Sequence, residues 1–252
     1  MNFSGKRVLI TGGSRGIGKA CAQAFAERGA QVAINFVHNA EAAQETLASL
    51  PGEAHILNQT DVSRPELVEG MIADTVKGLG GLDILVNNAG IGRHHPIDTV
   101  SYDEWQESWQ RILSINLTAP ANVIYWAVQH MRANGGGRIV NVSSRGAFRG
   151  EPEQPAYGAS KAGLNAMTQS LAQKLAPENI YLGVVAPGFV ETDMAARTLS
   201  GPQGDGIRNQ SPLGRVARPE EVAYAVLFLA AEESKFSTGT IIDVNGASYL
   251  RG

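Results

Sequence analysis

The stretch VLITGGSRGIGKACAQAFAERG, residues 8–29, joins a short apolar run to an amphipathic helical pattern through a glycine-rich turn. The apolar run predicts a buried strand, and the pattern that begins at Gly16 predicts a helix. Glycines at Gly12, Gly16 and Gly18 permit a tight turn, close approach of the backbone to a phosphate and close helix packing. The helix N-terminus adds free N–H groups and the positive end of its dipole. We therefore predict a phosphate-binding loop here, although a glycine-rich loop alone can also be an ordinary turn.

The rest of the chain continues this alternation of strand and helix. Apolar runs predict strands at 7–10, 31–35, 54–58, 83–88, 137–144, 180–187 and 240–246, and helices are predicted to begin near Gly16, Ala40, Pro65, Asp103, Tyr157 and Pro219. The longest helical stretch is predicted at 101–134, and residues 189–219 form an irregular region of the kind that often covers a binding site. Alternating strands and helices indicate an α/β fold with a parallel sheet covered on both faces. We expect one domain over residues 1–252.

Composition limits the classes of partner. The 252 residues carry a net charge of -3, so there is no basic field for nucleic acid or anionic lipid, and a small-molecule substrate is expected. No apolar run reaches the length of a membrane span, and the chain enters its first strand without a charged and apolar leader. The single cysteine, Cys21, lies in an apolar helical run, where a buried, unreactive thiol is expected. These features favour a cytoplasmic protein.

The residues after the second strand bear on the choice of cofactor. An acidic residue about 20 positions after the glycine loop would hold the ribose 2′-hydroxyl of NAD. This chain has Phe36 near that point and no acid before Glu41, whereas Arg15 lies in the glycine loop and His38 follows the strand. A 2′-phosphate would meet donors and no carboxylate. The pattern therefore favours NADP(H), with NAD(H) as the alternative.

The stretch PAYGASKAG, residues 155–163, places Tyr157 and Lys161 four residues apart among small side chains. On a helix this spacing puts both on one face, where the ammonium would favour the phenolate and lower the pKa of the tyrosine. Such a pair suits a proton donor that works near neutral pH. The same spacing also occurs on many helices where both side chains are simply solvated, so the rest of the chain has to support the interpretation.

These pieces together resemble the short-chain dehydrogenase/reductase family over almost the whole chain. The matching motifs, in the family's order, are TGGSRGIG at 11–18, NNAG at 87–90, NVSS at 141–144, YGASK at 157–161 and PGFVETDM at 187–194. The resemblance implies a doubly wound Rossmann fold with seven parallel strands, a nicotinamide cofactor and catalysis by an Asn-Ser-Tyr-Lys set. Within the family the chain looks most like 3-oxoacyl-[acyl-carrier-protein] reductases, through INF at 34–36, GFVETDM at 188–194 and SPLGRVARPEEVA at 211–223.

The resemblance assigns roles residue by residue. It implies that Tyr157 is the proton donor, that Lys161 is its partner and holds the nicotinamide ribose, and that Asn116 holds a water that relays protons. Ser144 lies thirteen residues before the tyrosine, the family's spacing, so it is expected to bind the substrate carbonyl, with Ser143 as a structural neighbour. The implied cofactor-binding residues are Gly12, Ser14, Arg15, Gly16, Ile17, Gly18, Asn35, His38, Asp61, Val62, Asn88, Ala89, Gly90, Tyr157, Lys161, Pro187, Gly188, Val190 and Thr192.

Three further expectations concern metal, assembly and substrate. The RHH segment at 93–95 contains two adjacent histidines, which do not point to one ligand position on regular structure, so no metal site is expected. The helix face with Ala159, Gly163, Ala166 and Ser170 has little bulk, and family members often pair this helix in a tetramer, so a homotetramer is expected. The substrate is a carbonyl compound or secondary alcohol, with a 3-oxoacyl thioester ahead of a sugar, a polyol or another small alcohol. A scaffold without turnover is the remaining alternative.

Overall fold

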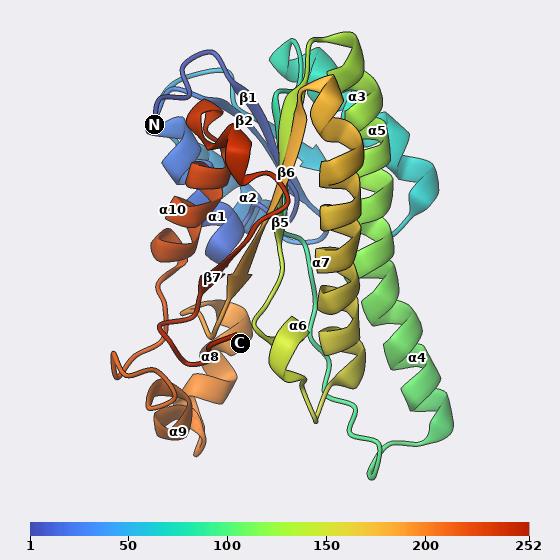
Figure 1. The fold of residues 1–252 in the computed structure, drawn as a ribbon, viewed down its shortest axis with the longest axis vertical. Helices are drawn as coiled ribbons and strands as arrows, with labels where there is room; N and C mark the ends of the chain where they lie inside the picture. The colour runs from blue at the N-terminus through green and yellow to red at the C-terminus, as the bar shows by residue number, and fades with distance from the viewer. Residues whose placement is uncertain (252) are drawn as a thin grey trace.

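Seven parallel strands pair side by side in one sheet of order β3-β2-β1-β4-β5-β6-β7 (Figure 1). The computed structural model describes residues 1–251, so Gly252, the last residue of the expected domain, lies outside the described residues. The strands are β1 Arg7–Ile10, β2 Gln31–Phe36, β3 Ile56–Gln59, β4 Ile84–Asn87, β5 Gly137–Val142, β6 Ile180–Pro187 and β7 Ile241–Val244. All seven strand predictions are confirmed. The third begins two residues later than predicted, because Ala54 has a φ of 63°, which is incompatible with an extended strand.

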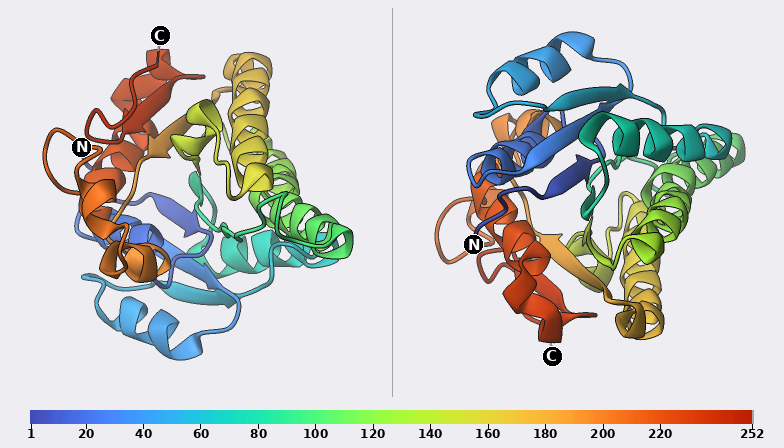
Figure 2. Two further views of the ribbon diagram at one scale, coloured as in Figure 1. Left: turned by 90° about the horizontal axis from the view of Figure 1, so that it is seen from below. Right: turned by 90° about the horizontal axis from the view of Figure 1, so that it is seen from above.

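Helices cover both faces of the sheet, as expected for a doubly wound fold (Figure 2). They are α1 Gly16–Ala26, α2 Ala40–Ala48, α3 Pro65–Leu79, α4 Tyr102–Leu113, α5 Ala119–Ala133, α6 Gly146–Arg149, α7 Pro155–Leu175, α8 Asp193–Ser200, α9 Gly204–Arg208 and α10 Pro219–Ala230. Apolar residues of α1 and α10 pack on one face, and those of α3, α5 and α7 pack on the other. Within residues 1–251 no helix is long and apolar enough to cross a lipid bilayer.

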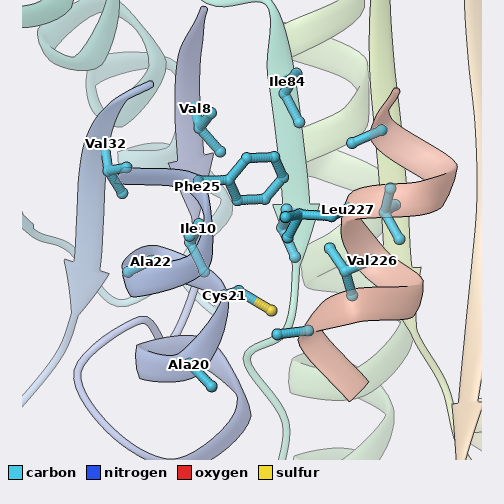
Figure 3. Packing of buried hydrophobic residues seen from close by; sticks show 14 of the residues in the cluster. Val8, Ile10, Ala20, Cys21, Ala22, Phe25, Val32, Ile84, Val226 and Leu227 are labelled. Carbon is cyan, nitrogen blue, oxygen red and sulfur yellow. The ribbon is translucent and has the colours of Figure 1, made fainter. Parts of the chain in front are cut away.

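Residues 8–29 contribute β1 and α1 to the core on one face of the sheet. Phe25 and Cys21 on α1 lie between strand residues such as Val8 and Ile10 and the apolar face of α10 (Figure 3). Cys21 has no exposed surface, and burial raises the pKa of its thiol to about 12. The prediction of a buried cysteine is confirmed, and a thiol with this pKa remains protonated and unreactive near neutral pH.

The long helical stretch predicted at 101–134 is interrupted. A capping box formed by Ser101 and Glu104 starts α4, and α5 ends at Ala133. Between the two helices, residues Ser114–Thr118 form a π-helical turn that contains Asn116. Such turns insert one extra residue into a helix and occur often at functional sites.

The region at 189–219 is more ordered than its irregular composition suggested. It contains α8 and α9, and the buried side chains of Leu199, Ile207 and Val216 form a small apolar cluster of their own. Together with α6, these helices lie beyond the carboxyl ends of the strands (Figure 1). In open parallel sheets, ligands bind at this edge, at the point where the strand order reverses. Here the order reverses between β1 and β4.

Candidate active site

Helix α7 carries Tyr157 and Lys161 into the edge formed by the carboxyl ends of the strands. Its first residue is Pro155, which suits a first helical turn because its missing N–H needs no partner there. Lys161 is 5% exposed, and its Nζ donates a hydrogen bond to the carbonyl oxygen of Val142 at 2.9 Å. The same Nζ lies 5.9 Å from the centre of the Tyr157 ring. The structure thus brings together the two residues that the spacing placed on one face.

The pKa of Tyr157 differs from the expectation. Burial raises the pKa of Tyr157, while a hydrogen bond with Ser144 lowers it and the negative charge of Glu151 raises it. Burial also lowers the pKa of Lys161 to about 8. The predicted lowering of the tyrosine pKa by the lysine is not found, because burial is the largest influence on the phenol and raises its pKa.

Asn116 joins this pair through the π-helical turn. Its Nδ2 donates to the carbonyl oxygen of Ile91 and its Oδ1 accepts from the N–H of Ile91, both at 2.9 Å. The same Nδ2 also donates to Ser160 Oγ at 3.2 Å. A Cβ built on Gly90 would lie 3.3 Å from Asn116 Oδ1 and 3.4 Å from Lys161 Nζ, so all three residues meet. Asn116 is fully buried within this turn.

The two serines at the end of β5 have different surroundings. Ser143 is buried, and its Oγ donates to the carbonyl oxygen of Lys161 at 3.3 Å. Ser144 is partly exposed, its Oγ accepts from the N–H of Gly146 at 3.0 Å, and it hydrogen-bonds with Tyr157. The serine that shares an open position with the phenol is therefore Ser144, and Ser143 braces α7.

The glycine loop and the end of β4 lie against each other beside this group of residues. Thr11 Oγ1 accepts from the N–H groups of Asn88 and Ala89 at 3.0 and 3.1 Å. Asn88 Nδ2 in turn donates to the carbonyl oxygens of Thr11 and Gly12, both at 3.0 Å. Gly18 packs so closely that a Cβ there would lie 2.2 Å from the Gly12 oxygen. The first turn of α1 is thus held against the switch point of the sheet.

The conformation of the glycine loop suits the phosphates of a dinucleotide. Gly12 and Gly16 have φ values of 62° and 52°, which L-residues with side chains rarely adopt. Ser14 and Ile17 lie between and beside them, and α1 has no acidic residue in its first turn to repel an anion. The loop therefore has no side chain at its two left-handed positions, a geometry that would let a phosphate approach the start of α1 closely.

The residues expected to bind the 2′-position of the cofactor's ribose have two kinds of surroundings. Arg15 and His38 are exposed, and Arg15 Nη1 lies 3.5 Å from the Asp193 carboxylate of α8. Asn35 is buried instead, and its side chain bonds to Gly12 N at 3.4 Å and to Thr60 O at 2.9 Å. Asn35 therefore braces the glycine loop, and Arg15 and His38 are the available donors.

The remaining expected residues lie along the same edge. Asp61 accepts from the N–H and hydroxyl of Ser63 at 2.9 and 2.7 Å, and the neighbouring Val62 is buried. At the end of β6, Pro187 and Val190 are buried, and the N–H of Gly188 donates to Val244 O at 3.0 Å. Thr192 approaches the glycine loop, because a Cβ on Gly16 would lie 3.0 Å from its methyl group.

Sequence reasoning missed four residues that hold the site together. Thr11 and Ser160 stand inside quoted motifs but were given no role, and Ser160 Oγ donates to Tyr157 O at 2.7 Å. His95 is fully buried, and its Nδ1 and Nε2 bond to Arg93 O and Ala156 N at 2.7 and 3.3 Å. Arg145 is also buried directly after Ser144. Only the place of these residues inside or beside motifs could have drawn attention to them.

The adjacent histidines point in different directions. His94 Nε2 lies 3.0 Å from the Glu153 carboxylate on the surface, whereas His95 faces the interior. Within residues 1–251 no group of three or more His, Cys, Asp or Glu side chains is arranged to hold a metal ion.

Comparisons with known proteins agree with this geometry. A family model described as enoyl-(acyl carrier protein) reductase matches residues 12–247. The 3-oxoacyl-[acyl-carrier-protein] reductase of Escherichia coli is 39% identical over 252 residues, which cover 99% of this chain and 100% of that relative. An uncharacterized oxidoreductase of Thermotoga maritima is 38% identical over 255 residues, covering 98% and 99% of the two chains.

Solved structures give the same result. A short chain dehydrogenase from Burkholderia cenocepacia in complex with NADP has a TM-score of 0.89 and 35% identity, covering 98% of this chain and 99% of that chain. A dehydrogenase/reductase from Sinorhizobium meliloti has a TM-score of 0.88 and 33% identity, covering 99% and 97%. The chain therefore belongs to the short-chain dehydrogenase/reductase family and is an oxidoreductase of that family.

Proposed function

We propose that this protein is an NADP(H)-dependent reductase that converts a carbonyl compound into a secondary alcohol. The observation that carries the proposal is the meeting of Ser144, Tyr157 and Lys161 beside the glycine loop at the switch point of the sheet. The relatives that are named 3-oxoacyl-[acyl-carrier-protein] reductases support it.

Each side chain of the site has its own role in the proposed reduction. The glycine loop, Asn88 and Gly188 would hold a nicotinamide cofactor, which would supply the hydride when bound. Ser144 and Tyr157 donate hydrogen bonds to the carbonyl oxygen, where negative charge builds during reduction. Tyr157 then gives its proton to that oxygen, and positioned proton transfer of this kind contributes about 10² to 10⁴ in rate. Lys161 and Asn116, which meet beside Gly90, hold the polar path by which the phenol regains a proton.

Preference for NADP(H) is proposed from Arg15. A guanidinium can form two charge-assisted bonds with a 2′-phosphate, and it has an accessible position next to the glycine loop. Its exposed contact with Asp193 is weak enough for a phosphate to replace. We expect Arg15→Gln to lower kcat/KM for NADPH about 10- to 100-fold and to leave kcat/KM for NADH nearly unchanged. Arg28→Gln, which removes the same charge at the far end of α1, is the matched control. If the wild type prefers NADH, the NADP(H) assignment is wrong.

The substrate class is tested with a panel of compounds. NADPH oxidation should be followed with 3-oxoacyl thioesters, simple ketones and esters, sugars and an enoyl thioester. Reduction of ketones and 3-oxoacyl compounds supports the proposal, and reaction with sugars or polyols alone favours the alternative of a sugar or polyol dehydrogenase. Absence of turnover with every compound, in a protein that still binds NADPH, would support a scaffold without catalysis.

We also propose a homotetrameric, cytoplasmic protein. Ala159, Ala166 and Ser170 are exposed on one face of α7, and Gly163 on the same face is partly exposed. Small side chains of this kind let two copies of a helix approach closely. Sedimentation at micromolar concentration should give a mass well above that of the monomer, and cell fractionation should place the protein in the cytosol. A monomer would contradict the proposed assembly.

A further inference from the structure

A buried histidine from the segment after β4 reaches the first turn of α7. His95 has no exposed surface, and its backbone N–H donates to Glu153 O at 2.8 Å, just before the helix begins. Its ring Nε2 bonds to the backbone N–H of Ala156 at 3.3 Å, across a separation of 61 residues in sequence. Ala156 directly precedes Tyr157 in α7. The histidine therefore holds the backbone next to the proposed proton donor.

The two ring bonds of His95 assign one tautomer. Its Nδ1 lies 2.7 Å from Arg93 O, and a carbonyl oxygen can only accept, so Nδ1 carries the proton. The backbone N–H of Ala156 can only donate, so Nε2 is the acceptor. Both ring nitrogens of the neutral histidine are satisfied in this arrangement. The ring thus offers α7 a hydrogen-bond acceptor.

This acceptor supplies a partner that the first turn of α7 lacks. The first N–H groups of a helix have no carbonyl one turn earlier to receive them. Pro155 has no N–H, and the N–H of Tyr157 donates to Gln154 O at 3.0 Å. In the part of the chain that the structure describes, the Gln154 side chain makes no capping bond. Ala156 is fully buried, so without the His95 ring its N–H would be unpaired away from water, which is costly.

Other elements hold the His95 ring in this position. The centre of the ring lies 5.6 Å from the centre of the Trp105 ring of α4, at an interplanar angle of 61°. At the other end of the same segment, the N–H and the carbonyl oxygen of Ile91 both bond to the Asn116 side chain at 2.9 Å. Residues 91–95 therefore connect the π-helical turn to the first turn of α7.

We infer that His95 is a positioning residue of the proposed reductase: its neutral ring caps α7 and so sets the place of Tyr157 relative to the substrate carbonyl. The inference rests on the proposed function, because the proton transfer that it serves is the one proposed for Tyr157. Misplacement of a reacting group by about 1 Å can cost about 100-fold in rate. The ring nitrogens bond to backbone groups, so His95 acts through α7, and its loss should lower kcat without weakening the binding of NADPH.

Three substitutions separate the cap from the other contacts of the ring. His95→Gln can place an amide oxygen near the position of Nε2, where it accepts from Ala156. His95→Asn can place an amide nitrogen near the position of Nδ1 and reaches only Arg93, and His95→Phe keeps a ring against Trp105 without either bond. With NADPH and ethyl acetoacetate, kcat should fall about 10- to 100-fold in the asparagine and phenylalanine variants and less than about threefold in the glutamine variant. The KM of the ester and the Kd of NADPH should change less than about threefold in all three.

The matched control is His94→Phe, because His94 pairs with the Glu153 carboxylate on the surface and its loss should leave kcat unchanged. Amide hydrogen exchange adds a measurement that needs no turnover. Residues 155–161 should exchange about tenfold faster or more in His95→Asn and His95→Phe, and near the wild-type rate in His95→Gln. A wild type that does not reduce ethyl acetoacetate would count against the proposed function, and the exchange rates would still decide whether His95 caps α7.

Each remaining outcome overturns the inference. Equal losses of kcat in His95→Gln and His95→Asn would show that the acceptor for Ala156 is not what matters. Unchanged kcat in His95→Asn, or unchanged exchange at residues 155–161, would show that α7 needs no cap from this ring. A raised KM with unchanged kcat would show that the histidine only shapes its own loop. If the phenylalanine variant does not fold, the glutamine and asparagine variants, which differ by one methylene group, still give the answer.

Discussion

Replacing Lys161 with methionine should abolish turnover and yet stabilise the cofactor-free protein. The ammonium is 5% exposed, and burial lowers its pKa from 10.5 to about 8. A cation whose pKa is lower in the folded state binds its proton less tightly there than in the unfolded chain. Between pH 8 and 10.5 the unfolded chain therefore holds more protons, and folding becomes more favourable as the pH rises.

The size of the effect follows from the two pKa values. At about 1.4 kcal/mol per pH unit, the fall from 10.5 to about 8 costs the folded protein about 3 kcal/mol at pH 7. At pH 10 Lys161 is neutral in the folded protein and still mostly protonated in the unfolded chain, and the same relation leaves about 1 kcal/mol. Methionine removes this cost. It also leaves Val142 O without its donor, which subtracts about 1 kcal/mol at every pH.

The assay is urea unfolding of Lys161→Met and wild type, measured side by side at pH 7 and pH 10 without cofactor. Comparison at each pH cancels the titration of all other groups. We expect the advantage of the variant to be about 2 kcal/mol at pH 7 and to fall by about 2 kcal/mol or more by pH 10. If the difference between the two proteins is the same at both values, Lys161 carries no burial cost and the reasoning fails.

Four further substitutions test the site. Tyr157→Phe removes only the proton donor, so turnover should fall about 10²- to 10⁴-fold while NADPH binding, measured by calorimetry, is retained; turnover at a third of the wild-type rate would contradict the assignment. Ser144→Ala should be damaging and Ser143→Ala mild in kcat, and the reverse order would show that the other serine faces the carbonyl. Gly18→Ala puts a Cβ 2.2 Å from the Gly12 oxygen, so it should lower stability by about 1–3 kcal/mol and weaken NADPH binding; an unchanged melting temperature would refute the tight packing.

Much of the fold could be predicted because local pattern and tertiary structure agree. The strand at Val8 is buried on both faces in a parallel sheet, so residues 8–10 are all apolar. Helix α1 begins at Gly16, whose positive φ favours glycine at that position. Tyr157 and Lys161 could be paired because a helix fixes which residues share a face. These features depend on the chain within a few residues of each position.

Features that depend on distant contacts could not be predicted. The π-helical turn at Asn116 is stabilised by the peptide group of Ile91, 25 residues away in sequence. The raised pKa of Tyr157 comes from burial, which a bare sequence does not reveal. Helices α8 and α9 pack through an apolar cluster whose members, Leu199, Ile207 and Val216, follow no helical or strand spacing in a region rich in turn residues.

The distribution of contacts explains how one site can be both rigid and selective. The catalytic edge is held by polar side chains that bond to backbone groups, as Thr11 does with Asn88 and Ala89, and such bonds fix loops in single positions. The covering region rests on a cluster of three buried apolar residues and on the neutral contacts of Arg145. A few contacts of this kind can change without moving the residues of the catalytic edge. Substrate choice is therefore expected to lie in the covering region, where contacts can change while the polar side chains of the catalytic edge stay in place.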